Sequence, residues 1–222
     1  MKSTRTIRTW CNGTCLVVLL GVTLVPPAAL RAWAETATDQ LKGSVGQVIR
    51  VLEDPRLKPE SMTAQRRAAI RKEADNIFDF AESAKRALGP HWQGLSEKDR
   101  GEFVSVYADL LERAYISKID RYTGERISYE RESVDGDLAT VKSRFITKQG
   151  TEIPIDYRLL RRGDRWLVYD VSVEGVSLIG NYRTQFNKII QTASYQELVR
   201  KMKAAEFTAP GAAPQRDKAP RS

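Results

Sequence analysis

The stretch from Asp164 to Phe186 constrains the fold most, because it holds a strand, a helix and the joint between them. Residues 166–173, WLVYDVSV, supply the aromatic and β-branched side chains that suit a largely buried strand. Gly175 interrupts this pattern. The apolar residues that follow repeat at the spacing of one helix face: Ile179, Tyr182, Phe186, Ile189 and Ile190. The sequence therefore predicts a strand that turns at Gly175 into a helix folded back onto the sheet.

The chain before residue 120 has helical periodicity. Helices are expected over residues 41–53, from Ser61 or Thr63 to about 77, over 78–88, and from Ser96 to about 115. Pro55 stops the first helix, and Gly89-Pro90 closes the third. Ser96 and Asp99 form a capping-box-like pair at the start of the fourth helix. These signals predict a helical first half.

Strand patterns follow the helices. Strands are expected over residues 126–134, 138–148, 152–161 and 164–173, joined by turns at Asp135-Gly136, Gln149-Gly150 and Arg162-Gly163-Asp164. Two helices then close the chain, over 177–192 and 195–205, the second with a capping box of Ser194 and Glu197. Only helices are available to cover the apolar face of such a meander. The predicted fold class is therefore α+β, a curved four-stranded antiparallel sheet wrapped by N- and C-terminal helices.

The run WLVYDVSVEGVSLIGNYRTQFNKII, residues 166–190, closely resembles the signature of the MlaC (toluene-tolerance, Ttg) family of periplasmic phospholipid-binding proteins. The resemblance extends upstream through IFDF (77–80), ALGPHW (87–92), the helix around 103–115 and IPIDYRL (153–159). It implies a cone with an apolar lipid cavity and a phospholipid cargo. It also implies two partners, an inner-membrane Mla-type ABC transporter complex and an outer-membrane lipoprotein–porin complex. Such a carrier maintains outer-membrane lipid asymmetry and is not an enzyme. A hopanoid or another apolar lipid is the alternative cargo.

Both ends of the chain differ from the middle. Residues 1–34 have the features of an export signal: basic residues from Lys2 to Arg8, an apolar run from Cys15 to Val25, and a cleavage site at Ala32-Trp33-Ala34. A run of about eleven apolar residues is shorter than the roughly 20 that span a bilayer. Residues 35–207 are expected to form a single lipid-binding domain in the periplasm. Residues 208–222, rich in proline and alanine, are expected to be a disordered tail.

The composition of the mature chain argues against several function classes. The formal net charge of +8 falls to +4 without residues 1–34, which carry four basic and no acidic side chains. A nucleic-acid-binding domain would need a strongly basic, clustered face. Both cysteines lie within the predicted signal, and His91 is the only histidine, so a metal site is not expected. No phosphate-binding loop or dinucleotide motif is present, and no cofactor is predicted.

A serine hydrolase is the sharpest enzymatic alternative, because Ser177 lies at a strand-to-helix turn. The run from Gly175 to Gly180 is one residue too long for a nucleophile elbow, and His91 precedes the serine instead of following it. Asp170 and Glu174 are about 13 Å apart on an extended strand, too far for a carboxylate pair. Ser177 is more simply interpreted as a residue that caps a helix N-terminus.

The expected lipid-binding residues come from apolar stripes that would face one another: Phe103, Tyr107, Leu111, Tyr115, Ile155, Tyr157, Tyr169, Val171, Ile179, Tyr182 and Phe186. Arg183 is expected either near a lipid headgroup or as a brace for Asp170. The basic residues of the second helix are Arg66, Arg67, Arg71 and Lys72. This run of charges favours a solvent-exposed helix face whose positive charge is balanced by Glu73 and Asp75. The alternative is a basic patch that binds lipid headgroups or an acidic partner protein.

Overall fold

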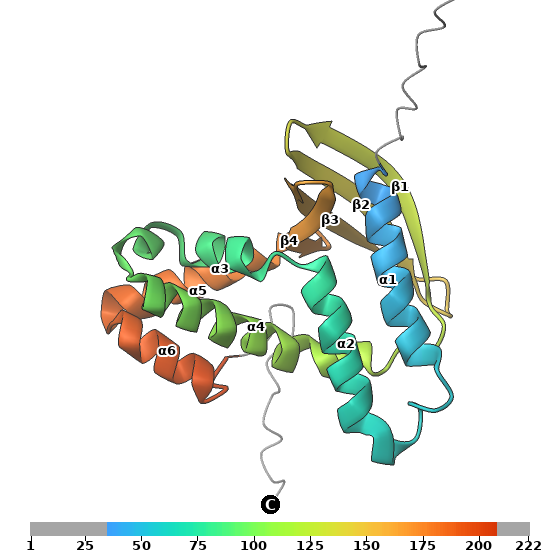
Figure 1. Cartoon of the computed structure of the whole chain (residues 1–222), viewed down its shortest axis with the longest axis horizontal. Coiled ribbons are helices and arrows are strands. Elements are labelled where there is room, and N and C mark those ends of the chain that lie inside the picture. The colour runs from blue at the N-terminus through green and yellow to red at the C-terminus, as the bar shows by residue number, and fades with distance from the viewer. Residues whose placement is uncertain (1–34, 208–222) are drawn as a thin grey trace, which may run out of the picture. The chain divides into compact units, whose positions relative to one another are not determined.

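A computed structural model describes residues 35–207 of the chain (Figure 1). The predicted signal, 1–34, and the predicted tail, 208–222, lie outside the described residues. Within residues 35–207, no helix is long and apolar enough to cross a membrane.

Helices pack against a single antiparallel sheet, which confirms the α+β class. Before the sheet come α1 (Ala37–Glu53), α2 (Thr63–Ile77), α3 (Phe80–Leu88) and α4 (Glu97–Ile119), with short 3-10 turns at Glu60–Met62 and Gly89–Gly94. The sheet contains β1 (Arg126–Asp135), β2 (Leu138–Ile146), β3 (Glu152–Arg162), β4 (Arg165–Val173) and β5 (Val176–Ser177). The chain then continues into α5 (Leu178–Thr192) and α6 (Tyr195–Lys203). Figure 1 shows α1 lying across the sheet and α3 to α6 gathered beside one another.

The sheet has five strands in sequence order instead of the four expected. The additional strand, β5, is two residues long and pairs Ser177 with Ser172. Glu174 and Gly175 connect it to β4 with φ angles of 51° and 80°. Two consecutive positive φ angles are typical of a tight hairpin turn. The predicted turn at Gly175 is therefore a hairpin that precedes the helix, and a two-residue strand leaves no periodic pattern.

Serine caps fix the start of three helices. The side chains of Ser96, Ser177 and Ser194 each accept a hydrogen bond from the backbone N–H three residues further along. Asp99 and Glu197 provide two of these N–H groups, so the serine half of both predicted capping boxes is observed, whereas the Glu197 carboxylate pairs with Arg200 instead of returning to the Ser194 N–H. Each cap satisfies a donor that the first turn of a helix would otherwise leave free.

The buried apolar side chains form two separate clusters. The helix cluster, built by α3, α4, α5 and α6 with one residue of β4, contains Ala84, Ala87, Leu88, Phe103, Val106, Tyr107, Leu110, Tyr169, Ile179, Tyr182, Phe186, Leu198, Val199 and Met202. The sheet cluster, built by α1, the end of α2 and the inner face of the sheet, contains Ala37, Leu41, Ile77, Ala139, Val141, Leu159, Trp166 and Val168. A compact domain usually has one contiguous core. Because the core is divided into two clusters, some apolar side chains belong to neither of them.

A bulge lets β4 contribute to both clusters. The register with β3 shifts between Arg158, opposite Asp170, and Leu159, opposite Val168, so Tyr169 is the additional residue. Val168 is buried in the sheet cluster and Tyr169 in the helix cluster. The bulge shifts the alternation along β4, so that Val168 and Val171, which lie opposite Leu159 and Tyr157, share one face of the sheet.

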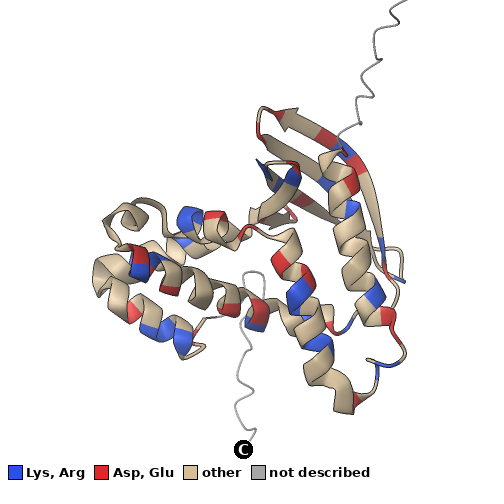
Figure 2. Ribbon diagram, in the orientation of Figure 1, with Lys and Arg blue, Asp and Glu red and all other residues tan. Residues whose placement is uncertain are grey.

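The basic residues of α2 bind acidic side chains of α4. Arg66 and Arg67 donate to the two carboxylate oxygens of Asp120 at 3.1 and 2.9 Å. Arg71 pairs with Asp75, as the solvated-face interpretation expected, and also with Asp109 and Glu112 on α4. Figure 2 shows basic and acidic residues on both helices. These carboxylates occupy the three arginines, so their role is to attach α2 to α4, not to form an unpaired basic patch.

We expect Asp120→Ala to lower the free energy of unfolding by about 1–3 kcal/mol, because it leaves the half-buried guanidinium of Arg66 unpaired. Urea denaturation followed by circular dichroism measures the change. Asp54→Ala is the control, because Asp54 pairs with the exposed Arg56 and its loss should change stability much less than the loss of Asp120. Equal effects of both substitutions would contradict a bridging role for Asp120.

Candidate functional site

Asp170 organises the joint between the sheet and α5. Its carboxylate is buried and accepts hydrogen bonds from the Ser177 hydroxyl at 2.7 Å and the Ile179 backbone N–H at 3.1 Å. Arg158, opposite it on β3, approaches to 3.4 Å. A negative charge at a helix N-terminus is favourable, because the free N–H groups there carry partial positive charge. Asp170 therefore anchors the start of α5 to β4.

Ser177 has the structural role that the sequence predicted. Its oxygen accepts from the Gly180 N–H at 2.9 Å while its hydroxyl donates to Asp170. The imidazole of His91 instead bonds to the side chain of Asn187 at 2.9 Å. A serine nucleophile requires a base that accepts its proton and is oriented by a third group. The observed bonds do not form that arrangement.

Arg183 does not brace Asp170. Its Nε donates to the backbone carbonyl of Arg86 on α3 at 2.8 Å. Arg158 takes the position beside Asp170, because the register of β3 and β4 places those two residues directly opposite each other. Arg86, Arg158 and Arg183 all line a small hollow of about 250 Å³ at this joint.

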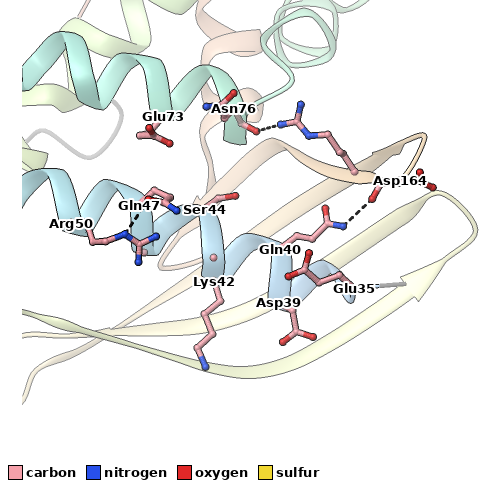
Figure 3. A pocket seen from close by; sticks show the side chains of 13 residues that line it. Glu35, Asp39, Gln40, Lys42, Ser44, Gln47, Arg50, Glu73, Asn76 and Asp164 are labelled. Atoms are coloured by element: carbon pink, nitrogen blue, oxygen red, sulfur yellow. Dashed lines mark hydrogen bonds between the residues drawn. The ribbon is translucent and has the colours of Figure 1, made fainter. Parts of the chain in front are cut away.

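A larger hollow of about 840 Å³ lies along the polar side of α1 (Figure 3). It is lined mainly by polar residues of α1, the end of α2 and the turn between β3 and β4. Within it, the Gln40 side chain donates to the Asp164 carbonyl and accepts from the Trp166 N–H. None of the predicted lipid-lining residues borders this hollow. Its polar lining is unsuited to acyl chains.

Six of the eleven predicted apolar lining residues pack together in the helix cluster. Phe103, Tyr107, Tyr169, Ile179, Tyr182 and Phe186 are all buried there. The Tyr107 ring meets the edges of Tyr182 and Phe186 at centroid distances of 5.8 and 6.0 Å. Leu111 is partly buried against the same cluster, and Tyr115, further along α4, is partly buried. These contacts are those of ordinary aromatic packing.

The other predicted residues lie on the inner face of the sheet, at the end away from α1's N-terminus. We call this region the distal sheet face: Ile127, Tyr129, Phe145, Ile153, Ile155, Tyr157, Val171 and Val173, which the strand register places on one side. All eight are partly buried. Five of them, Ile127, Phe145, Ile153, Ile155 and Val173, pack on neither cluster of the described residues. The structure thus presents a contiguous apolar face with incomplete cover.

Sequence reasoning identified three residues of the distal sheet face, Ile155, Tyr157 and Val171, and missed the others. The apolar alternation of Ile127 with Tyr129 was the available signal. The phenols on this face are desolvated: burial raises the pKa of Tyr157 to about 12 and also raises that of Tyr129. The face is thus a low-polarity environment even where it is only partly covered.

Known proteins resemble this chain over most of its length. The model of a family described as MlaC protein matches residues 42–204. The intermembrane phospholipid transport system binding protein MlaC of Haemophilus influenzae is 23% identical over 141 residues, which cover 61% of this chain and 66%, just under two thirds, of that protein. A solved phospholipid-binding protein from Ralstonia solanacearum, in complex with a phospholipid, aligns with a TM-score of 0.67 and 21% identity. That alignment covers 76% of this chain and 96% of the solved one, which establishes a shared fold.

Proposed function

Because this chain belongs to the MlaC family, we propose that it is a periplasmic phospholipid carrier that binds lipid without modifying it. The names of its relatives support this proposal, since one is a phospholipid transport binding protein and another was solved with a phospholipid. Residues 1–34 would direct export and be removed near Ala34.

The observation that carries the proposal is the distal sheet face. Apolar side chains left partly exposed across four neighbouring strands are costly in water unless something apolar covers them. Acyl chains can do so, because each buried CH₂ contributes about 0.8 kcal/mol. The membership of the two clusters supports the same assignment, since Ile155, Val173 and three further apolar residues of this face pack against neither of them.

The lipid would contact the distal sheet face on one side and the helix cluster on the other. From the sheet, the contacts are Ile155, Tyr157 and Val171, and we add Ile127, Tyr129, Phe145, Ile153 and Val173. From the helices, Leu111 and Tyr115 are the partly buried candidates. The buried residues of the helix cluster that pack beside them include Phe103, Tyr107, Tyr169, Ile179, Tyr182 and Phe186. Arg183 is exposed and is the candidate for contact with a headgroup.

Carrier function requires partners on both membranes. We assign to this chain the role of moving phospholipid between an outer-membrane lipoprotein–porin complex and an inner-membrane Mla-type ABC transporter complex, which contributes to outer-membrane lipid asymmetry. The relative from Haemophilus influenzae, named as part of an intermembrane transport system, supports this role. The energy for transport would come from the transporter complex, and the carrier would only bind and release the lipid.

Native mass spectrometry tests the proposal directly. The full chain, expressed for export in a Gram-negative bacterium and purified from the periplasm, is expected to retain one phospholipid, identified after solvent extraction. A co-purified hopanoid would keep the carrier role and change the cargo. Protein that is bare on purification, and still bare after incubation with labelled phospholipid liposomes, would overturn the proposal.

A further inference from the structure

Two buried phenol hydroxyls have no hydrogen-bond partner among the described residues. They belong to Tyr182 on α5 and Tyr115 on α4. Tyr182 is fully buried in the helix cluster, where its ring stacks on Phe186 at a centroid distance of 5.6 Å. Buried hydroxyls are almost always hydrogen-bonded, and leaving one without a partner costs free energy. Two such groups in one region call for an explanation.

The two hydroxyls are neighbours, but together they can satisfy only one of their two O–H donors. The interaction between the phenols of Tyr115 and Tyr182 contributes to the pKa shift of both, but their hydroxyls do not lie at well-formed hydrogen-bond geometry. A small rotation would allow one hydroxyl to donate to the other, but each phenol has only one O–H. One donor would still lack an acceptor. At least one of the two O–H groups therefore has no acceptor among residues 35–207.

The surroundings favour an uncharged acceptor. Tyr107 packs edge-on against Tyr182, and its pKa is raised first by burial and further by the nearby Tyr182 phenol and Asp170 carboxylate. An anion here would lose its hydration and stand near the negative charge of Asp170. The amino group of Lys118 lies over the Tyr115 ring, 5.3 Å from its centroid. A neutral carbonyl oxygen would accept from the phenols without the cost of burying a charge.

We propose that the hydroxyls of Tyr115 and Tyr182 donate hydrogen bonds to an ester carbonyl oxygen of the bound lipid, an inference that rests on the carrier function proposed above. Ester carbonyls are the neutral acceptors attached directly to the acyl chains of a phospholipid. The phenols thereby make the carrier selective for ester-linked over ether-linked lipids. Burial keeps them available as donors, since it raises the pKa of Tyr182 to about 12 and raises that of Tyr115 as well.

A competition between two lipids tests this selectivity. The full-length protein is incubated with liposomes that contain equal amounts of a diester phosphatidylcholine and its diether analogue of the same chain length. The bound lipids are then extracted and quantified by mass spectrometry. We expect the wild type to enrich the diester lipid by roughly 2- to 12-fold, the range for loss of one net hydrogen bond. In the Tyr115→Phe/Tyr182→Phe double variant, the ratio should fall to about 1.

Tyr195→Phe provides a matched control. Tyr195 packs against the same helix cluster, but its hydroxyl already donates to the Asp99 carbonyl at 3.2 Å. Its removal should leave the diester preference unchanged. Phenylalanine keeps the shape of each ring, so lipid-free double variant should be at least as stable as the wild type, since it no longer buries unpaired hydroxyls.

The outcomes separate this inference from the proposed function. Uptake of both lipids in equal amounts by the wild type, or a preference that survives in the double variant, would overturn the tyrosine assignment and leave the carrier function intact. A double variant that loses stability without lipid, and keeps its lipid ratio, would identify a buried water as the partner and also overturn the assignment. Failure of the wild type to take up either lipid would overturn the carrier function, and the inference with it.

Discussion

Asp170→Ala is expected to lower the free energy of unfolding by about 3 kcal/mol, a large effect for a single polar side chain. The change leaves the buried Ile179 N–H without its acceptor and removes the carboxylate that holds the Ser177 hydroxyl. Each unsatisfied buried group costs about 1–3 kcal/mol, and loss of a helix N-terminal anchor adds about 1 kcal/mol. Urea denaturation at neutral pH measures the difference.

Three further substitutions give the prediction its controls. Asp170→Asn keeps the shape and should lose about half as much stability, since the amide oxygen can still accept one bond. Ser177→Ala should cost about 1 kcal/mol as a lost cap. Asp137→Ala, in an exposed turn, should cost less than about 0.5 kcal/mol. If Asp170→Ala behaved like Asp137→Ala, the joint would not depend on this carboxylate.

The helices and strands could be predicted because the relevant signals are local. A cap such as Ser96 or a stop such as Gly89-Pro90 acts within a few residues, and strand alternation marks a half-buried face without reference to the rest of the chain. The two-residue strand β5 is too short to show such an alternation. It depends on positive φ angles at Glu174 and Gly175, and only the second of these is a residue that predicts such a backbone.

The candidate site was harder to predict, because burial depends on how distant elements meet. An aromatic stripe predicts equally well a packed core and the wall of a cavity. Phe103 and Phe186 turned out to pack on each other, whereas Ile155 and Val173 face a region that neither cluster covers. Which charged side chains form ion pairs also depends on residues that are distant in the sequence. The bond between Arg158 and Asp170 depends on the register of β3 and β4, whereas sequence proximity favoured Arg183.

Ile155→Asp is expected to reduce phospholipid binding by about 100-fold or more. Ile155 lies on the central strand β3, between Ser143 and Val173 on the distal sheet face. An acyl chain on this face would desolvate the new carboxylate or force it to take up a proton, and either costs several kcal/mol. Since 1.4 kcal/mol corresponds to a tenfold change in affinity, the bound fraction should become undetectable. Quantified native mass spectrometry after incubation with labelled liposomes measures this fraction.

Ser128→Asp is the matched control for the added charge. Ser128 is exposed and lies on the opposite side of the sheet, where it pairs with Arg144 on β2, so its substitution should leave lipid binding unchanged. Ile155→Ala removes apolar contact without adding charge and should weaken binding by about tenfold at most. Thermal unfolding of each variant separates a folding defect from a binding defect. If folded Ile155→Asp protein still carried lipid at wild-type stoichiometry, the distal sheet face would not be where the acyl chains bind, and the helix cluster would have to open to admit them.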